Sequence, residues 1–201
     1  MHSLTTAPDA PGPHPTGTCT SSVPGSMESH PFDAHHGASL SPQVRELKDS
    51  PKVATYDLEP KMAAEPVADA MVREIEAGAH ALLICNLAPP DMVGHTGMMD
   101  KTMEAVSHTD MCIGKVVEAC KKAGVGLFIV ADHGNSETML TPEGKPITSH
   151  STSAVPFIAM LPADSPLKFS RKEGGVADVA PSMLMWMGIE IPKEMTGKSF
   201  F

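Results

Sequence analysis

Two segments of the sequence bring an aspartate and a histidine close together. Asp91 and His95 are four residues apart, and Asp132 and His133 are adjacent. On a helical turn, residues at positions i and i+4 share one face, so the first pair could hold a single ligand. A third histidine, His150, lies in a polar segment just before an apolar run. Carboxylate and imidazole groups together suit borderline divalent ions such as Mn²⁺ or Zn²⁺ better than Ca²⁺.

The five candidate ligands are too many for one tetrahedral site and too few for two complete ones. Two ions roughly 3.5–4 Å apart would clamp a phosphoryl group during in-line transfer. The Asp91/His95 pair alone is more simply explained as polar loop residues. A charged pair directly after a buried strand is more informative, because it must be solvated or bound. Since each group lies beside the end of an expected strand, the sequence predicts a metal site.

Alternating strands and helices must position these residues. Continuous apolar runs predict strands that are buried on both faces, and open α/β sheets bind ligands beyond the carboxyl ends of their strands. If the last strand runs antiparallel, its start and His150 lie at that same edge. The pattern predicts an α/β fold with a mainly parallel sheet and flanking helices. The expected strands are residues 52–56, 81–87, 126–130 and 155–160, and the expected helices are residues 65–77, 98–122 and 176–187.

The start of the chain has a different composition. Of the first 50 residues, 29 are Pro, Ser, Thr, Gly or His and only 13 are hydrophobic. Such a segment cannot bury enough apolar surface to offset its ordering entropy. We therefore expect a disordered tail over residues 1–49 and a metal-binding domain over residues 50–201. A metal-binding tract at His30, His35 and His36 is a less simple interpretation than chance histidines in a solvated tail.

Charge and cysteine content exclude several classes of protein. The formal net charge is -9, which argues against a nucleic-acid groove and against a basic membrane-surface helix. The longest apolar run has about seven residues, whereas a membrane span needs roughly 20, and no secretory signal is recognisable. Four cysteines, Cys19, Cys85, Cys112 and Cys120, match no CxxC pattern. We expect free thiols in the cytoplasm and neither nucleic acid nor membrane as a partner.

The segments that carry the candidate ligands resemble the metal-site motifs of cofactor-independent (2,3-bisphosphoglycerate-independent) phosphoglycerate mutase. They read PDMVGHTG from Pro90, ADHGNSE from Ala131 and HSTSAVPFI from His150, and the resemblance extends from about Ser50 to Phe201. The resemblance implies part of an alkaline-phosphatase-like domain. Members of this family are glycolytic isomerases. They interconvert 3- and 2-phosphoglycerate through a phosphoserine intermediate held by two Mn²⁺ ions.

The resemblance also implies a role for each ligand. Asp91, His95 and His150 match the ligands of one ion, whereas Asp132 and His133 match only two ligands of the other. The family's second ion also takes an aspartate from an N-terminal DG motif and the nucleophilic serine, and we find neither in this sequence. The domain whose arginines and lysines hold phosphoglycerate is also missing. Mn²⁺ is the expected metal, with Mg²⁺, Co²⁺ or Zn²⁺ as alternatives.

Three interpretations of function stay open. The chain is a mutase by family that is inactive without its missing parts, or a non-catalytic metal-binding fragment or incomplete gene model. A third interpretation, another metal phosphohydrolase of the alkaline phosphatase superfamily, is weaker. Its only serine signal, Asp164-Ser165, is followed by Pro166. Ser136 beside His133 could replace the nucleophile, but a hydroxyl that shapes the loop is the simpler interpretation.

Overall fold

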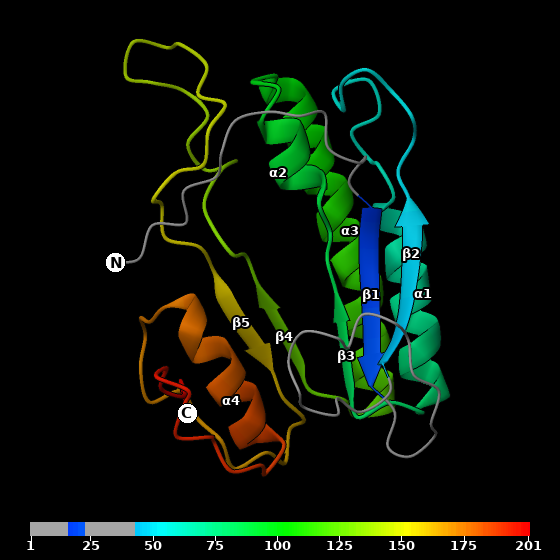
Figure 1. Ribbon diagram of the computed structural model, residues 1–201, viewed down its shortest axis with the longest axis vertical. Helices are drawn as coiled ribbons and strands as arrows, with labels where there is room; N and C mark the ends of the chain where they lie inside the picture. The colour runs from blue at the N-terminus through cyan, green and yellow to red at the C-terminus, as the bar shows by residue number, and fades with distance from the viewer. Residues whose placement is uncertain (1–15, 23–42) are drawn as a thin grey trace.

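The computed structural model describes residues 16–22 and 43–201, in which strands and helices alternate (Figure 1). The α/β class predicted from the sequence is confirmed. All the strand pairs in these residues are antiparallel, however, so the expected mainly parallel sheet is wrong for them. One sheet has the order β2-β1-β3 and the other pairs β4 with β5. The strands are β1 (Thr16–Ser22), β2 (Gln43–Asp49), β3 (Leu82–Cys85), β4 (Leu127–Val130) and β5 (Phe157–Met160).

Connections explain why the strand directions differ from expectation. A strand, a crossover helix and a second strand normally give parallel neighbours. Here β3 is followed by two helices and then β4, yet β3 and β4 are at the edges of two separate sheets. The neighbour of β4 is β5, which returns after a long loop and pairs Val130 with Phe157. The antiparallel direction expected as one option for this last strand is therefore confirmed.

The two long helices match the sequence prediction to within one residue at each end. They are α1 (Ala64–Ala77) and α3 (Met99–Ala123). Both end at a glycine in the left-handed conformation, Gly78 at φ 63° and Gly124 at φ 69°, as helix C-termini favour. A short helix, α2 (Pro89–Gly94), precedes α3, and α4 (Val179–Trp186) follows the 3-10 turn η2 (Val176–Asp178). None of the helices in the described residues is long and apolar enough to cross a membrane.

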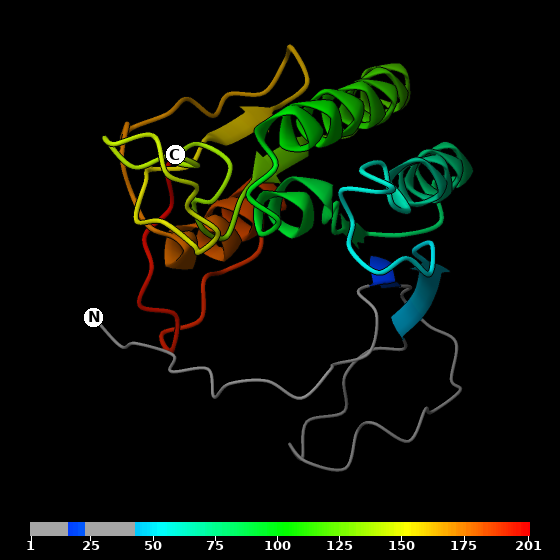
Figure 2. The same cartoon turned by 90° about the horizontal axis from the view of Figure 1, so that it is seen from above.

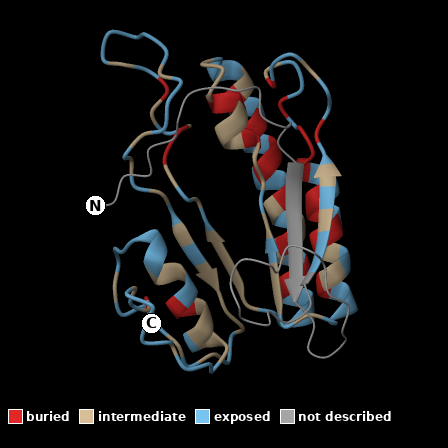
Figure 3. Ribbon diagram, in the orientation of Figure 1, coloured by how far each residue is buried: buried red, intermediate tan, exposed pale blue. Residues whose placement is uncertain are grey.

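The main hydrophobic core lies between α1 and α3. Figure 2 shows these helices together on one side of β1, and Figure 3 shows buried residues gathered in α1, α2 and α3. Strands β3, β4 and β5 are half-buried, and Ile84 of β3 is 53% exposed, so the expectation of strands buried on both faces is wrong for them. The core residues are Ala64, Ala68, Met71 and Ile75 of α1 with Cys112, Val116, Ala119 and Cys120 of α3.

Free thiols occupy this core. Cys112 and Cys120 are buried and free, and Cys85 is half-buried. Burial raises the pKa of the Cys112 and Cys120 thiols, because a low-dielectric surrounding disfavours the thiolate. The expectation of free thiols is confirmed for Cys112 and Cys120, whereas the side chain of Cys19 lies outside the described residues.

Residues 52–56 were expected to form a strand but form a loop. The amides of Leu58 and Glu59 donate hydrogen bonds to the carbonyls of Thr55 and Tyr56, so the backbone turns instead of extending. Tyr56 is only 8% exposed and packs in a second core cluster with Met62, Val93 and Ala105. Tertiary burial of this aromatic ring outweighs the β propensity of its neighbours.

The disordered tail expected over residues 1–49 is wrong for two segments. Residues 16–22 and 43–49 are strands β1 and β2, and β1 also pairs with β3. Backbone pairing needs no apolar side chain, so a polar composition prevents it neither in the central strand β1 nor in the edge strand β2. In β2, Glu46 accepts hydrogen bonds from Lys48 and from Arg73 of α1, which fastens the strand to the helix. The rest of the expected tail, with His30, His35 and His36, lies outside the described residues.

The C-terminal segment is anchored on Asp178 at the start of α4. Its carboxylate accepts hydrogen bonds from the Gly175 amide at 2.9 Å and the Lys198 amide at 2.7 Å, and it pairs with Arg171 at 3.0 Å. These donors lower the pKa of Asp178 to about 2, the backbone amides contributing most. The guanidinium of Arg171 also lies 4.8 Å from the centre of the Phe200 ring.

Replacement of Asp178 by alanine should destabilise the fold in a pH-dependent way. Because the folded state lowers the pKa of this carboxyl, its contribution is complete above about pH 4 and disappears as the pH falls toward 2. We expect a melting temperature about 4–8 °C lower at pH 6, the shift for about 2 kcal/mol in a chain of this size. Calorimetry at pH 6 and pH 2.5 measures it. An equal loss of melting temperature at pH 6 and pH 2.5 would contradict this role of the Asp178 carboxylate. The same loss in the exposed control Asp164→Ala would also contradict it.

Candidate metal centre

Helix α2 brings Asp91 and His95 together. Pro89 and Pro90 begin this helix, where a missing amide hydrogen has no cost. The His95 amide donates to the Asp91 carbonyl at 3.0 Å, so the two residues occupy one helical turn. Their side chains consequently meet, with His95 Nε2 3.2 Å from Asp91 Oδ1. The common face expected from the i, i+4 spacing is confirmed.

His150 completes a compact triangle of donor atoms. Its Nε2 lies 3.1 Å from His95 Nε2 and 3.4 Å from Asp91 Oδ1. The expected convergence of these three side chains to within about 5 Å is confirmed, since one ligand atom of each lies within 4.8 Å of the others. Donors bound at about 2.1 Å to a single tetrahedral or octahedral ion lie about 3.0–3.4 Å apart. The triangle therefore has the size that one divalent ion requires.

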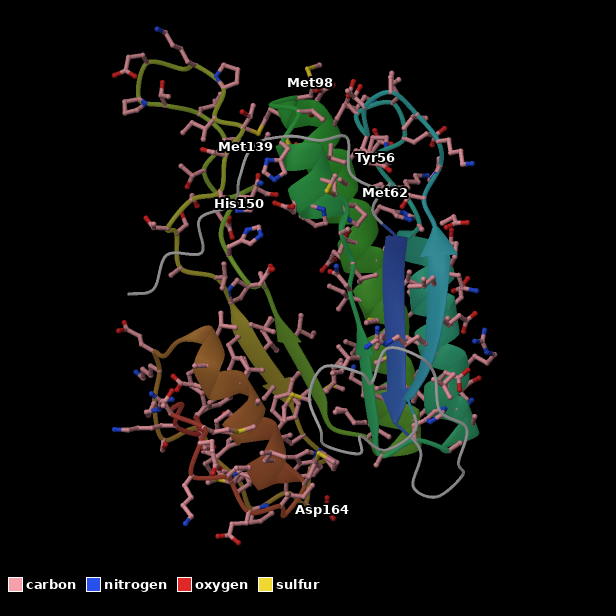
Figure 4. All side chains as sticks on the ribbon, in the orientation of Figure 1. Tyr56, Met62, Met98, Met139, His150 and Asp164 are labelled. Carbon is pink, nitrogen blue, oxygen red and sulfur yellow. The ribbon has the colours of Figure 1, made fainter. Side chains whose placement is uncertain are left out.

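The loop that carries His150 is held by backbone contacts. The Ser151 amide donates to the Gly134 carbonyl at 2.8 Å, in an isolated bridge beyond the paired ends of β4 and β5. His95 donates from Nδ1 to the Thr148 carbonyl at 2.6 Å, which leaves its Nε2 as the free ligand atom. A histidine ligand is typically oriented by such a bond from its other nitrogen. Figure 4 shows His150 beyond one end of these strands and Asp164 at the other end.

Asp132 and His133 lie beside this triangle rather than in it. The His133 ring stacks on His150 with 3.7 Å between centroids, and its Nδ1 is 4.0 Å from Asp91 Oδ1. Its Nε2 is 3.7 Å from Asp132 Oδ1, and the Asp132 side chain is 84% exposed. The structure thus brings all five predicted residues to one region, three as a tight cluster and two as an open pair next to it.

Sequence reasoning missed three residues that support the cluster. Asn135 donates from Nδ2 to Asp91 Oδ1 at 2.7 Å, Thr148 supplies the carbonyl bound to His95, and Gly94 packs against Asn135. The position of Asn135, two residues after an Asp-His pair, is only a weak sequence signal for such a role. The backbone carbonyl of Thr148 leaves no signal in the sequence at all. Ser136 donates its hydroxyl to the Pro90 carbonyl at 2.8 Å, which agrees with the interpretation of a loop-shaping hydroxyl.

A cavity of about 1240 Å³ begins at these residues. Consecutive residues 80–88 and 125–133 line it along β3 and β4, and Asp91 lies on its wall. Each of these strands is an edge of its own sheet, so the cavity lies where neither strand has a β partner on that side within the described chain. Neither lysine nor arginine is among the described residues that line it. Arg73 and Arg171 are paired with carboxylates elsewhere.

Residues 29–191 match the model of the Metalloenzyme superfamily. The resemblance to cofactor-independent phosphoglycerate mutase is also confirmed. A protein of Clostridium novyi named 2,3-bisphosphoglycerate-independent phosphoglycerate mutase is 49% identical over 158 residues, which are 78% of this chain and 31% of that protein. An Onchocerca volvulus protein of the same name is 48% identical over 162 residues, covering 78% of this chain and 30% of its own length. The chain therefore spans about a third of the curated relatives it matches.

A solved structure agrees with these relatives. Crystal structures of Leishmania mexicana phosphoglycerate mutase at low cobalt concentration include a chain that superposes with a TM-score of 0.68 at 25% identity. The superposition covers 76% of this chain and 30% of that one. The α/β arrangement and the donor triangle agree with the family match, which extends over most of the sequence. The chain belongs to the Metalloenzyme superfamily.

Proposed function

We propose that Asp91, His95 and His150 hold one divalent metal ion. The triangle of donor atoms, with sides of 3.1, 3.2 and 3.4 Å, is the observation that carries this proposal. Two imidazoles and a carboxylate leave coordination positions open for water or a phosphate oxygen. This mixed donor set favours Mn²⁺, Co²⁺ or Zn²⁺ over an ion that prefers oxygen alone, such as Mg²⁺. Mn²⁺ is our first candidate because of the family resemblance.

We propose that Asp132 and His133 contribute part of the shell of a second ion. The stacking of His133 on His150 keeps the pair next to the first site, as a centre with two neighbouring ions would require. The exposed Asp132 carboxylate is open to further ligands from outside this segment. Metal ions at such a centre neutralise the charge that develops on a phosphoryl group. The residues of this chain would orient those ions.

We propose that the chain supplies the metal-binding part of a cytoplasmic phosphoglycerate mutase, an isomerase of glycolysis. Its relatives carry that name, and its buried thiols Cys112 and Cys120 are free, as thiols are in a reducing compartment. Interconversion of 3- and 2-phosphoglycerate also needs a nucleophile and cations for the substrate carboxylate. In our proposal these come from outside the 201 residues, because the cavity beside the site has no lysine or arginine in its described lining.

The cavity between β3 and β4 supports the proposal that the remaining catalytic groups come from outside these residues. A polypeptide strand in that space would pair with both free strand edges, and one of its ends would reach Asp91 and Asp132. Unpaired strand edges favour such pairing. We propose that the remainder of a mutase occupies the cavity in this way. A non-catalytic metal-binding chain is the second candidate, favoured by the coverage of only about 30% of the relatives' length.

Equilibrium dialysis against Mn²⁺ tests the first of these proposals. The chain, first stripped with a chelator, is expected to bind one ion tightly, because only the triangle of Asp91, His95 and His150 offers three converging donors among the described residues. The matched control is Asp164→Asn, which removes an exposed carboxylate at the far end of the β4–β5 pair (Figure 4) and should bind equally. Binding of no ion, or loss of binding in the control, would contradict the proposed site.

A further inference from the structure

We propose that Asn135 is a positioning residue for the metal centre and that Gly94 preserves the space it occupies. Asn135 touches no ion in this proposal. It acts through Asp91, whose carboxylate it holds in the orientation that faces the two histidines. The inference rests on the proposed metal site, and it assigns a role to two residues outside the set of five predicted ligands.

The hydrogen bond of Asn135 is directed at the ligand atom itself. Its Nδ2 donates at 2.7 Å to Asp91 Oδ1, the same oxygen that lies 3.2 Å from His95 Nε2 and 3.4 Å from His150 Nε2. An ionised carboxylate oxygen has more than one lone pair, so it can accept this bond and coordinate an ion together. If the Asp91 carboxylate rotated away from the triangle, this hydrogen bond would break. The bond therefore favours the orientation that faces the two histidines.

Asn135 is itself held in place. It is only 5% exposed, so water competes weakly for its amide. Its backbone amide donates to Glu137 Oε2 at 2.8 Å, and the neighbouring Ser136 hydroxyl donates to the Pro90 carbonyl at 2.8 Å. The loop after β4 is therefore bound to α2 at two points, one of which is the carboxylate. A fixed donor orients a ligand better than a mobile one.

Gly94 is required by this arrangement. A Cβ added at this last residue of α2 would lie 2.2 Å from Asn135 Oδ1 and 3.0 Å from its Cγ, and its three nearest atoms all belong to the Asn135 side chain. No side chain tolerates such a distance, so alanine at this position must displace the Asn135 amide. The displacement would break the bond to Asp91 without altering any donor atom of the metal site.

The location of Asn135 also links the two groups of ligands. It follows Asp132 and His133 on the loop after β4, while its partner Asp91 lies on α2. A neutral amide suits this link, because it donates without adding charge. An aspartate at 135 would set a second carboxylate against Asp91, and a lysine would compete with the ion for that oxygen.

A double-mutant cycle tests the inference, with Mn²⁺ affinity measured by isothermal titration calorimetry on the full chain. We expect Asn135→Ala to weaken Mn²⁺ binding about 10–100-fold, the usual effect of removing a residue that orients a ligand. Gly94→Ala should weaken it to a similar extent. In the Asn135→Ala background the added methyl group has no amide to displace, so Gly94→Ala should then change the affinity less than about twofold.

Ser136→Ala is the matched control. It removes a hydrogen bond between the same loop and α2, but none to the carboxylate, so its effect on Mn²⁺ affinity should be much smaller. Melting of the metal-free variants reports on folding separately. Unchanged affinity in Asn135→Ala, additive losses in the double variant, or an equal loss in Ser136→Ala would each overturn the inference. If the wild-type chain binds no Mn²⁺, the proposed function fails as well, and this outcome is distinct from the other three.

Discussion

Replacement of His150 by alanine is expected to remove most of the stability that Mn²⁺ gives to the folded chain. At a free Mn²⁺ concentration of 100 times the wild-type Kd, binding adds about 2.7 kcal/mol to the free energy of unfolding. Loss of one of three protein ligands should weaken affinity at least about 100-fold, since even residues that only orient ligands cost about 10–100-fold. The same concentration then stabilises His150→Ala by at most about 0.4 kcal/mol. Urea unfolding with Mn²⁺ or a chelator measures both values.

The half-exposed position of His150 makes this comparison clean. Its side chain is 51% exposed and lies outside both core clusters, so the metal-free variant should unfold at nearly the wild-type urea concentration. Asp164→Asn, which lies far from the site, should keep the full Mn²⁺ effect. Full stabilisation of His150→Ala by Mn²⁺ would show that the donor triangle is not the binding site. Stabilisation lost equally in the Asp164 variant would point to nonspecific binding of the ion.

The clustering of the candidate ligands could be predicted because their positions follow from strand ends. Asp132 and His133 come directly after β4, and β5 returns antiparallel to it, which brings His150 back to the same edge. Spacing alone puts Asp91 and His95 on one helical turn. The supporting residue Asn135 was not predicted, because its role depends on a contact across 44 positions of the chain. No local pattern specifies such a contact.

The fold was predicted where local physics decides it and missed where distant contacts do. Helices α1 and α3 follow from apolar periodicity and their terminal glycines. Strands β1 and β2 are polar segments without such a local signature. Backbone pairing with β3 holds β1 in place, and the hydrogen bond of Glu46 with Arg73 holds β2. Residues 52–56 have the composition of a strand, but burial of Tyr56 draws them into a turn. The placement of β3 and β4 in two separate sheets likewise depends on distant contacts and has no local sequence pattern.

The purified chain with Mn²⁺ is expected to show no measurable interconversion of phosphoglycerates. Phosphoryl transfer depends almost entirely on positioning and on stabilisation of charge. In our proposal Asp132 and His133 give only part of a second metal shell, and the described lining of the cavity holds no lysine or arginine for the substrate carboxylate. Removal of a nucleophile normally eliminates a covalent route altogether. Conversion of 3-phosphoglycerate, coupled to enolase, measures the rate, with the whole Clostridium novyi relative as the positive control.

Turnover near ~10 s⁻¹, a usual enzyme value, would contradict this expectation if it vanished in His133→Ala. A hydroxyl of the chain itself would then have to act as the nucleophile, and Ser136 is the nearest along the sequence to His133. Its hydroxyl already donates to the Pro90 carbonyl, so nucleophilic attack would first require that bond to break. Ser136→Ala would separate the two cases. Activity that persisted without Ser136 would assign the nucleophile elsewhere, whereas activity lost with Ser136, in a chain that still binds Mn²⁺, would identify it. We expect no turnover and therefore neither outcome. A hydroxyl that is hydrogen-bonded to the Pro90 carbonyl and holds the loop against α2 is poorly suited to attack a phosphoryl group.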